Sequence, residues 1–248
     1  MIAPRLARAA VAMWIAASIV SAPAFAKKPA FSYYLTTSEV DLSQLLEPPP
    51  APTSNVGRED TDTMAAVEAQ RTQADLDAAQ ADSKRTVFSF GDVIGSAFVQ
   101  THLPLTAALF AHTSGDTELL VQQAKAYFDR PRPEGVRQTH GSYPSGHAAF
   151  AACTAILLAE MIPERRDAIF RRAEIFADRR IVAGVHYPSD VEAGWIAGTL
   201  VAYALMRQPR FDADFRAARN ELRNALGLPA VATSGASGTF EAVLTSQK

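Results

Sequence analysis

The chain has 248 residues, with 24 Lys and Arg against 26 Asp and Glu, which gives a formal net charge of −2 at pH 7. This balance excludes the broad basic surface of a nucleic-acid-binding protein, so any affinity for anionic groups must come from a few basic side chains gathered in one place. The mean hydropathy is close to zero, which is too low for a chain that crosses a membrane many times.

The N-terminal segment has the three parts of a secretory signal peptide. Arg5 and Arg8 supply positive charge, residues 9–22 form an uncharged apolar run, and residues 24–26 (Ala-Phe-Ala) have the small side chains that signal peptidase accepts. The apolar run is short against the roughly 20 residues of a spanning helix. We therefore expect cleavage near Ala26 and a periplasmic or secreted protein that has no membrane segment in its mature form.

The next part of the chain predicts an arm followed by a polar helix. Residues 27–58 are rich in turn formers and contain Pro48-Pro49-Pro50, so we expect an extended arm with one short helix around residues 38–46. Residues 59–83 have sparse apolar positions among Ala, Gln, Glu and Asp, which predicts one surface helix with a thin buried stripe.

The body of the chain predicts helices and no strand, because no segment alternates between apolar and polar residues over a strand's length. Pro163 and Pro209 stand at expected helix starts, and Gly227 stands just past an expected end. We therefore expect an all-α, single-domain bundle over residues 59–229, followed by a flexible tail over residues 230–248. The expected helices cover residues 90–112, 116–128, 147–161, 163–185, 190–206 and 209–226.

Two of these expected helices, the ones from His147 and from Asp190, are apolar on most faces, which predicts burial at the centre of the bundle. Membrane spanning is the alternative explanation, but Glu160 and Glu192 interrupt the two apolar runs. Cys153 is the only cysteine and lies in the first run, so it is predicted to be a small buried hydrophobic residue that forms no internal disulfide.

Three separate segments concentrate Lys, Arg and His beside turn residues. Transfer of a phosphoryl group without a metal spreads charge over three oxygens, which fixed cations and backbone N–H groups stabilise. Arginine binds two phosphate oxygens with its planar fork and lysine adds a point charge, so Lys125, Arg132 and Arg180 are candidate phosphate ligands. The three segments are residues 125–133, 144–147 and 179–190.

The same segments contain candidates for the remaining chemistry. Ser145 and Gly146 precede an apolar helix, where unpaired N–H groups and the helix dipole favour an anion. His186 is a candidate nucleophile, because Asp190 lies four residues further on, at the spacing that lets a carboxylate fix the imidazole tautomer. His147 is then left as the general acid for the leaving alcohol.

Taken together, the segments resemble the signature of the class A bacterial non-specific acid phosphatases, which belong to the type 2 phosphatidic acid phosphatase superfamily with the vanadium haloperoxidases. That signature is Lys-x6-Arg-Pro, then Pro-Ser-Gly-His, then Ser-Arg-x5-His-x3-Asp. The resemblance implies metal-independent hydrolysis of many small phosphate monoesters through a phosphohistidine, inhibition by vanadate, no cofactor and possible homo-oligomerisation through the arm. The residues it implies are His186 (nucleophile), His147 (proton donor) and Asp190 (support), with Lys125, Arg132, Arg180, Ser145 and Gly146 as phosphate ligands.

The chain departs from the family pattern in two places and leaves one choice of register. Arg179 stands where the signature has serine, and the gap from Pro133 to Pro144 is shorter than usual. Arg130-Pro131 precedes Arg132-Pro133, so either arginine could fill the first motif, although the spacing of six residues from Lys125 favours Arg132.

Two alternative functions stay open at this point. A vanadium-dependent haloperoxidase would hold vanadate in the same anion site, and a non-catalytic phosphate-binding protein would need the cations but not His147 and His186. The other histidines, His102, His112 and His140, have no partners at metal-ligand spacing, so no metal site is expected. His140 lies close to the second motif and is a candidate for the entrance of the site.

Overall fold

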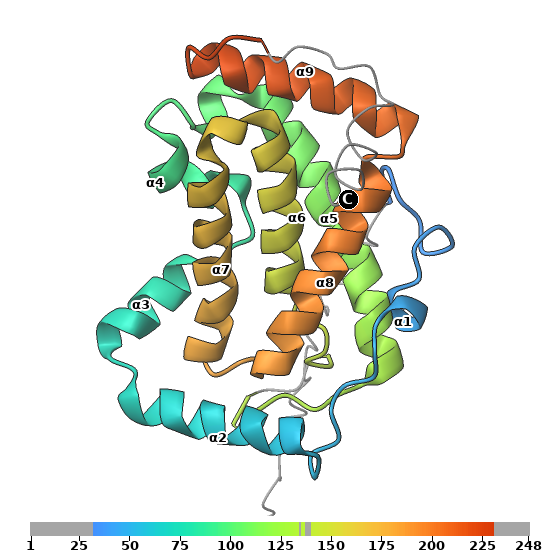
Figure 1. Ribbon diagram of the computed structural model, residues 1–248, viewed down its shortest axis with the longest axis vertical. Helices are drawn as coiled ribbons and strands as arrows, with labels where there is room; N and C mark the ends of the chain where they lie inside the picture. Colours follow the sequence, from blue (N-terminus) through green and yellow to red (C-terminus); the bar gives the residue numbers. More distant parts are fainter. Residues whose placement is uncertain (1–31, 134, 137–139, 231–248) are drawn as a thin grey trace, which may run out of the picture.

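The computed structural model describes residues 32–133, 135–136 and 140–230, and these residues form helices and connecting segments without any β-strand (Figure 1). The all-α prediction is therefore confirmed. The expected signal peptide and nearly all of the expected tail lie outside the described residues. The α-helices are α1 (Leu42–Leu45), α2 (Asn55–Gln70), α3 (Gln73–Ala81), α4 (Gly91–Ile94), α5 (Pro104–Phe128), α6 (Gly146–Met161), α7 (Arg166–Val182), α8 (Pro188–Leu205) and α9 (Pro209–Ala225).

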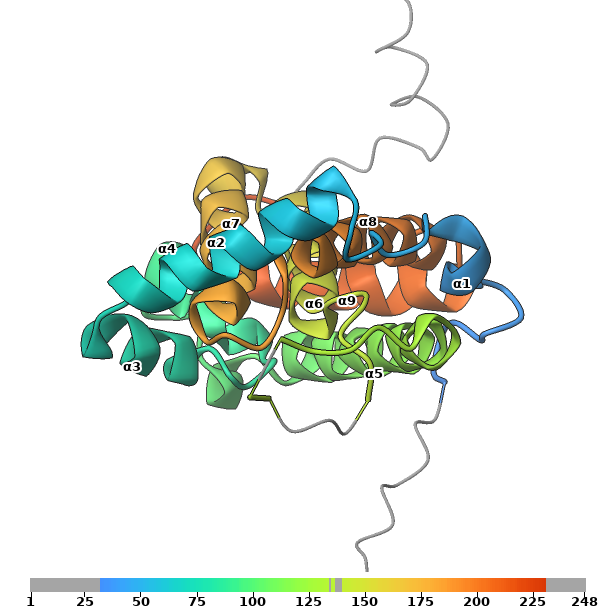
Figure 2. The ribbon, with the colours of Figure 1, turned by 90° about the horizontal axis from the view of Figure 1, so that it is seen from below.

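Helix α6 lies at the centre of the bundle and packs against α5, α7 and α8 (Figure 1). Its sequence is rich in Ala and Leu on every side, and nearly all of its residues are buried, including Cys153. Both the central burial of this segment and the interpretation of Cys153 are confirmed. Helix α9 covers one end of the bundle against α5, while α2 crosses the opposite end beside α7 and α8 (Figures 1 and 2).

Helices α6 and α8 approach closely because α8 carries glycines where the two helices touch. A Cβ atom on Gly194 would lie 2.4 Å from the carbonyl oxygen of Ser145, and one on Gly198 would lie 2.2 Å from that of Ala149. These distances leave no room for a side chain. The two glycines therefore bring the start of α8 against the start of α6, where the backbone N–H of Ser145 donates to the carbonyl of Asp190 (2.8 Å).

The described part of the N-terminal arm packs on the bundle, and α1 lies within the range expected for one short helix. The arm ends earlier than expected, because α2 begins at Asn55. The carboxylate of Asp116 on α5 accepts hydrogen bonds from the backbone N–H groups of Tyr33 (2.6 Å), Tyr34 (2.7 Å) and Leu35 (3.1 Å). Leu35 and Leu42 are fully buried among the core residues. The arm is thus fastened to α5 by a buried carboxylate and by its own apolar side chains.

Several helix boundaries differ from the sequence-based expectations. The polar stretch expected as one helix is divided into α2 and α3, because Thr72 and Asp75 form a capping box that starts a new helix after Arg71. The helix expected over residues 90–112 is wrong in its first half: the chain turns at Gly95 (φ 121°), and α5 begins only at Pro104.

The break expected between residues 112 and 116 is also wrong, since α5 continues to Phe128. Thr113 and Thr117 are buried within it, and their hydroxyl groups donate hydrogen bonds to backbone carbonyls of the preceding turn. Packing on the core therefore outweighs the weak helix propensity of this stretch. The helix expected over residues 163–185 begins as a short 3-10 helix at Pro163 and continues as α7. It ends at Val182, before Gly184 (φ 74°). Pro209 and Gly227 stand at the start and just past the end of α9, as predicted.

Candidate active site

The three basic segments meet at the end of the bundle that α2 crosses, where α5 and α7 end and α6 and α8 begin (Figure 1). Lys125 lies in the last turn of α5, and Ser145 is the N-cap of α6, with its hydroxyl accepting from the N–H of Ala148 (3.4 Å). Arg180 lies in the last turn of α7, and Asp190 lies in the first turn of α8. The tertiary structure thus gathers side chains that are far apart in the sequence.

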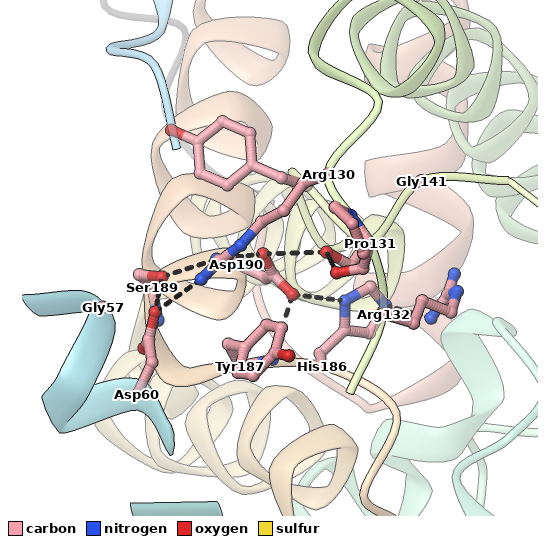
Figure 3. A network of polar contacts seen from close by, with 12 residues as sticks. Gly57, Asp60, Arg130, Pro131, Arg132, Gly141, His186, Tyr187, Ser189 and Asp190 are labelled. Atoms are coloured by element: carbon pink, nitrogen blue, oxygen red, sulfur yellow. Dashed lines mark hydrogen bonds and ion pairs between the residues drawn. The ribbon is translucent and has the colours of Figure 1, made fainter. Parts of the chain in front are cut away.

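His186 and Asp190 form the hydrogen-bonded pair that their spacing predicts (Figure 3). Nδ1 of His186 donates to Oδ2 of Asp190 over 3.3 Å, and the N–H of Tyr187 donates to the same oxygen (3.0 Å). Burial opposes the charge of Asp190, but the bond from His186 and the charge of Arg130 outweigh it and keep the pKa of this carboxyl below its usual value. Burial lowers the pKa of His186 to about 4, although Asp190 acts in the opposite direction.

The other ring nitrogen of His186 faces Arg132. Because Nδ1 carries the proton that Asp190 accepts, Nε2 holds a lone pair, and Nη1 of Arg132 lies 3.4 Å from it. The same Nη1 donates to the carbonyl oxygen of Val185 (2.7 Å), and Nε of Arg132 donates to the carbonyl of His140 (3.3 Å). A guanidinium is thus held beside the nitrogen of His186 that can attack an electrophile.

Arg130 has a different position and different partners (Figure 3). Its Nη1 lies 2.6 Å from Oδ1 of Asp190 and 2.8 Å from Oγ of Ser189, and its Nη2 lies 2.8 Å from Oδ2 of Asp60. The guanidinium also stacks over the ring of Tyr187. Arg130 therefore supports the carboxylate from behind, whereas the arginine favoured by the six-residue spacing is the one that faces the imidazole.

Asp60 on α2 was not expected from the sequence to take part in this network. Besides Arg130, it accepts hydrogen bonds from the backbone N–H of Ser189 (3.0 Å) and from the hydroxyl of the same residue. It is almost completely buried. Asp60 belongs to no local motif. Its only signal in the sequence is that it occupies one of the few inward-facing positions of a polar helix.

Lys125 is buried and holds the segment before the second motif. Its Nζ donates to the carbonyl oxygens of Gly141 (2.8 Å) and Ser142 (2.7 Å), and only 3% of the residue is exposed. Burial, together with the charge of Arg132, lowers the pKa of Lys125 to about 7. A Cβ atom on Gly141 would lie 2.9 Å from the carbonyl oxygen of Lys125, so the close approach of these two segments requires glycine.

The start of α6 faces a further arginine, Arg85, which lies outside the three motifs. A Cβ atom on Gly146 would lie 3.1 Å from Nη1 of Arg85, which forms an ion pair with Glu118 on α5. The charge of Arg85 also acts on Lys125 and Arg180 by lowering their pKa values. Arg85 is therefore part of the same cationic cluster, but it comes from the segment between α3 and α4, which contains no recognisable motif.

His147 also lies near the cationic cluster, since the charges of Arg180 and Arg85 act on it. Its Nε2 donates to the carbonyl oxygen of Ser83 (2.9 Å), and its ring stacks on Phe176. Burial and the neighbouring charge of Arg180 lower the pKa of His147 to about 3. The imidazole is thus neutral at neutral pH, with Nδ1 as the nitrogen that can exchange a proton.

The two arginines at the end of α7 have separate roles. Arg179, which replaces the serine of the signature, pairs with Asp82, a carboxylate that also binds Arg172 in a bidentate pair (2.9 and 2.6 Å). Nε of Arg180 is buried and has no hydrogen-bond partner within the described residues. Burial and the charge of Arg132 lower the pKa of Arg180. The departure from serine therefore ties α7 to the end of α3.

Within the described ranges, no group of three or more His, Cys, Asp and Glu residues is placed to hold a metal ion. His112 stacks on the ring of Tyr33 at 3.5 Å between centroids, so this histidine packs the arm onto α5. None of the helices described here combines the length and the apolar character that crossing a bilayer requires.

Fold and site together define a helical protein with two imidazoles beside a cluster of buried and half-buried cations, an arrangement suited to a tetrahedral oxyanion. Residues 103–213 match the family model of the PAP2 superfamily, in agreement with the three-part motif. The resemblance to the type 2 phosphatidic acid phosphatase superfamily that the motif indicated is therefore confirmed.

The chain is also similar to individual proteins that are named acid phosphatases. The chain is 37% identical over 95 residues to a non-specific acid phosphatase of Salmonella typhimurium, a match that covers 38% of each chain. It is 44% identical over 85 residues to an acid phosphatase of Zymomonas mobilis, covering 34% of this chain and 32% of that one. A non-specific acid phosphatase of Providencia stuartii is 26% identical over 241 residues, which cover 85% of this chain and 96% of the relative.

The stronger matches thus span well under half of each relative. Among solved structures, a transmembrane PAP2 type phosphatidylglycerolphosphate phosphatase from Bacillus subtilis has a TM-score of 0.46 and 20% identity, over 65% of this chain and 87% of that chain.

Proposed function

We propose that this protein is an acid phosphatase that hydrolyses phosphate monoesters through a phosphohistidine intermediate and uses no metal ion. The relatives named acid phosphatase support the reaction class. The observation that carries the proposal is the position of His186, whose Nδ1 is held by Asp190 while Nε2 faces the guanidinium of Arg132. An imidazole fixed in this tautomer is a nucleophile at neutral pH, and the guanidinium binds the group that it attacks.

The phosphoryl group is proposed to lie among Lys125, Arg132 and Arg180, against the first turn of α6. Ser145 and Gly146 supply a hydroxyl and a backbone N–H there. The buried Nε of Arg180, which no described residue accepts from, supports this placement, because a buried donor costs free energy unless an acceptor reaches it. These fixed positive groups stabilise the charge on the three oxygens that do not leave, which is the task a metal performs in other phosphatases.

In the first step, Nε2 of His186 attacks phosphorus while the bond from phosphorus to the ester oxygen breaks. The leaving oxygen takes a proton from Nδ1 of His147, because Nε2 of that ring already donates to the carbonyl of Ser83. Asp190 stabilises the positive charge that develops on the His186 imidazole. In the second step, water attacks the phosphohistidine and gives its proton to Nδ1 of His147, which releases phosphate and neutral His186.

The low pKa of His147 fits this cycle only if the substrate changes it. In the free protein, burial and Arg180 hold the pKa near 3. A bound phosphate dianion favours the imidazolium, so it raises the pKa of His147 toward the pH at which the enzyme works. The proton that the leaving group needs is therefore taken up together with the ester.

The decisive experiment uses the purified protein and a chromogenic phosphate ester in the presence of a chelator. We expect turnover and inhibition by vanadate. With an ester whose phosphoryl group is radiolabelled, the wild type should give a labelled phosphohistidine after rapid quenching without acid. His186→Ala should remove both turnover and label while the far-UV circular dichroism stays the same. Near-normal turnover by His186→Ala would exclude the mechanism.

The same assay separates the two alternatives. Halide oxidation by the vanadate-loaded protein without ester hydrolysis would identify a haloperoxidase, and phosphate binding without any turnover would identify a binding protein.

We also propose that the protein is exported. N-terminal sequencing of the protein from the periplasmic fraction should then give a chain that begins at Lys27, and a chain that retains Arg5 and Arg8 would contradict export with cleavage.

A further inference from the structure

A cavity of about 400 Å³ lies between α3 and the end of α7. Figure 2, which views the protein from below, shows α3 beside this end of α7, and the two helices are in contact. One wall consists of side chains of α3, and the other belongs to the segment that leads from α7 to His186. The lining residues are Gln73, Leu76, Asp77, Ala79, Gln80, Arg180, Ala183 and Val185.

The cavity adjoins the proposed phosphate ligands. Arg180 forms part of its wall. Val185 also lines it, and the carbonyl oxygen of Val185 accepts from Nη1 of Arg132, the same nitrogen that lies 3.4 Å from Nε2 of His186. An ester whose phosphoryl group lies on Arg132 and Arg180 therefore has this cavity next to it, on the side of α3.

The α3 wall offers neutral hydrogen-bonding groups and one negative charge. Gln73 and Gln80 carry amides, and the amide of Gln73 donates to the carboxylate of Asp77 (2.9 Å). A side-chain amide can both donate to and accept from a hydroxyl group, and a carboxylate accepts from one. Leu76 and Val185 add apolar surface that suits the carbon face of a sugar ring. The volume lies within the range of about 300 to 1,000 Å³ that small-molecule sites occupy.

Charge distinguishes the two parts of the site. The phosphate cluster is cationic, whereas Asp77 puts a negative charge on the far wall of the cavity. A leaving group that bears a second phosphate or a carboxylate would meet this charge and be repelled. A neutral leaving group with several hydroxyls would meet no such repulsion and could bind the polar groups of α3.

We propose that this cavity binds the leaving group of the ester and selects neutral, polyhydroxylated leaving groups, such as a sugar or a nucleoside, over anionic ones. The inference rests on the proposed phosphatase function and adds the substrate class to it. Residues of α3 then determine specificity, while the phosphate cluster determines the reaction.

The test compares kcat/KM of the full chain for a hexose monophosphate, a hexose bisphosphate and phenyl phosphate, whose leaving group has no further hydroxyl. Asp77→Ala and Gln80→Ala should each lower kcat/KM for the hexose monophosphate by about five- to tenfold, the value of one or two lost hydrogen bonds, with phenyl phosphate nearly unchanged. Asp77→Lys should raise the ratio of bisphosphate to monophosphate kcat/KM by about tenfold. Asp62→Lys, an equal change of charge at an exposed position of α2 outside the cavity lining, is the matched control and should leave the ratio unchanged.

The possible outcomes are distinct. If the wild type hydrolyses none of the three esters, the proposed function and the inference both fail. If it hydrolyses them but the α3 variants change all substrates equally, or none, only the leaving-group subsite is excluded. If Asp62→Lys alters the bisphosphate ratio as much as Asp77→Lys does, the effect belongs to net charge and the inference is again overturned.

Discussion

Nη1 of Arg130 lies 2.6 Å from Oδ1 of Asp190, while Oδ2 of the same carboxylate accepts from His186. One arginine thus fixes the carboxylate from the side opposite the imidazole. Arg130 is itself held by Asp60 on α2, so the orientation of His186 depends on a series of contacts that extends from the active site to α2.

This series of contacts predicts different effects for the two neighbouring arginines. Arg130→Gln should lower kcat by about tenfold or more, since a misplaced supporting group costs that much, and should leave KM nearly unchanged. Arg132→Gln should instead raise KM and the inhibition constant of inorganic phosphate, because this residue is proposed to touch the phosphoryl group. Steady-state kinetics of both variants measure the two parameters. A KM increase in Arg130→Gln together with a kcat loss in Arg132→Gln would reverse the roles assigned to the two residues.

Arg85 predicts a phosphate-affinity defect outside the three motifs. Its guanidinium lies against the start of α6, beside Gly146. Arg85→Ala should weaken binding of inorganic phosphate by about 10- to 100-fold, the cost of losing one charged hydrogen-bond donor from a buried anion site. Arg85→Lys should recover part of that loss.

The control for this experiment is Lys84→Ala, which removes a neighbouring positive charge that is exposed. Isothermal titration with phosphate should give wild-type affinity for the Lys84 variant. Equal losses for both variants would show that only general electrostatic attraction is involved.

The two histidines predict that stability depends on pH. In the folded protein the pKa of His147 is about 3 and that of His186 about 4, against about 6.5 for a histidine in an unfolded chain. The unfolded state therefore binds more protons between these values, so the free energy of unfolding falls as the pH drops below about 6.5. Urea unfolding at about pH 7 and about pH 4.5 should show this loss, and a double His147→Gln, His186→Gln variant should show less of it.

Bound phosphate should oppose this loss, because it stabilises the folded protein and favours the charged form of His147. We expect a larger increase in the midpoint of thermal unfolding from added phosphate in acid than at neutral pH. A phosphate effect that is the same at both pH values would contradict the proposed position of the anion next to the imidazole.

The contact of α6 with α8 predicts a steric defect. Gly194→Ala would place a methyl group 2.4 Å from the carbonyl of Ser145 and 2.8 Å from Cβ of Ala148. The two helices must separate to admit it, and we expect a loss of about 1 to 3 kcal/mol in the free energy of unfolding. Because Ser145 begins the anion site, kcat/KM should fall as well.

Gly115 on α5 offers a matched control, since a Cβ atom there meets nothing within 4 Å. Gly115→Ala should leave activity unchanged and raise stability by up to about 1 kcal/mol, through helix propensity alone. Chemical denaturation of the two variants measures the difference, and equal effects would exclude the close helix contact as the cause.

The amino-acid sequence alone predicted the features that depend on local geometry. Helical periodicity indicated the all-α fold, and the continuous apolar run after His147 indicated the central helix α6. The turn residues before that helix indicated a start at Ser145 or Gly146, and Ser145 is the N-cap. The pairing of His186 with Asp190 followed from a spacing of one helical turn. Each of these relationships joins residues that are neighbours along the chain.

The tertiary structure decided what depends on contacts between distant segments. The continuity of α5 through residues 112–116 results from packing, which outweighs propensity there. The ion pair of Arg130 with Asp60 joins residues 70 positions apart, and that of Arg85 with Glu118 joins residues 33 positions apart. Local spacing contains no information about such pairs, because the long helices between them set their distance. The position of Arg130 behind Asp190, and the α3 wall beside the phosphate cluster, could therefore be recognised only in the folded chain.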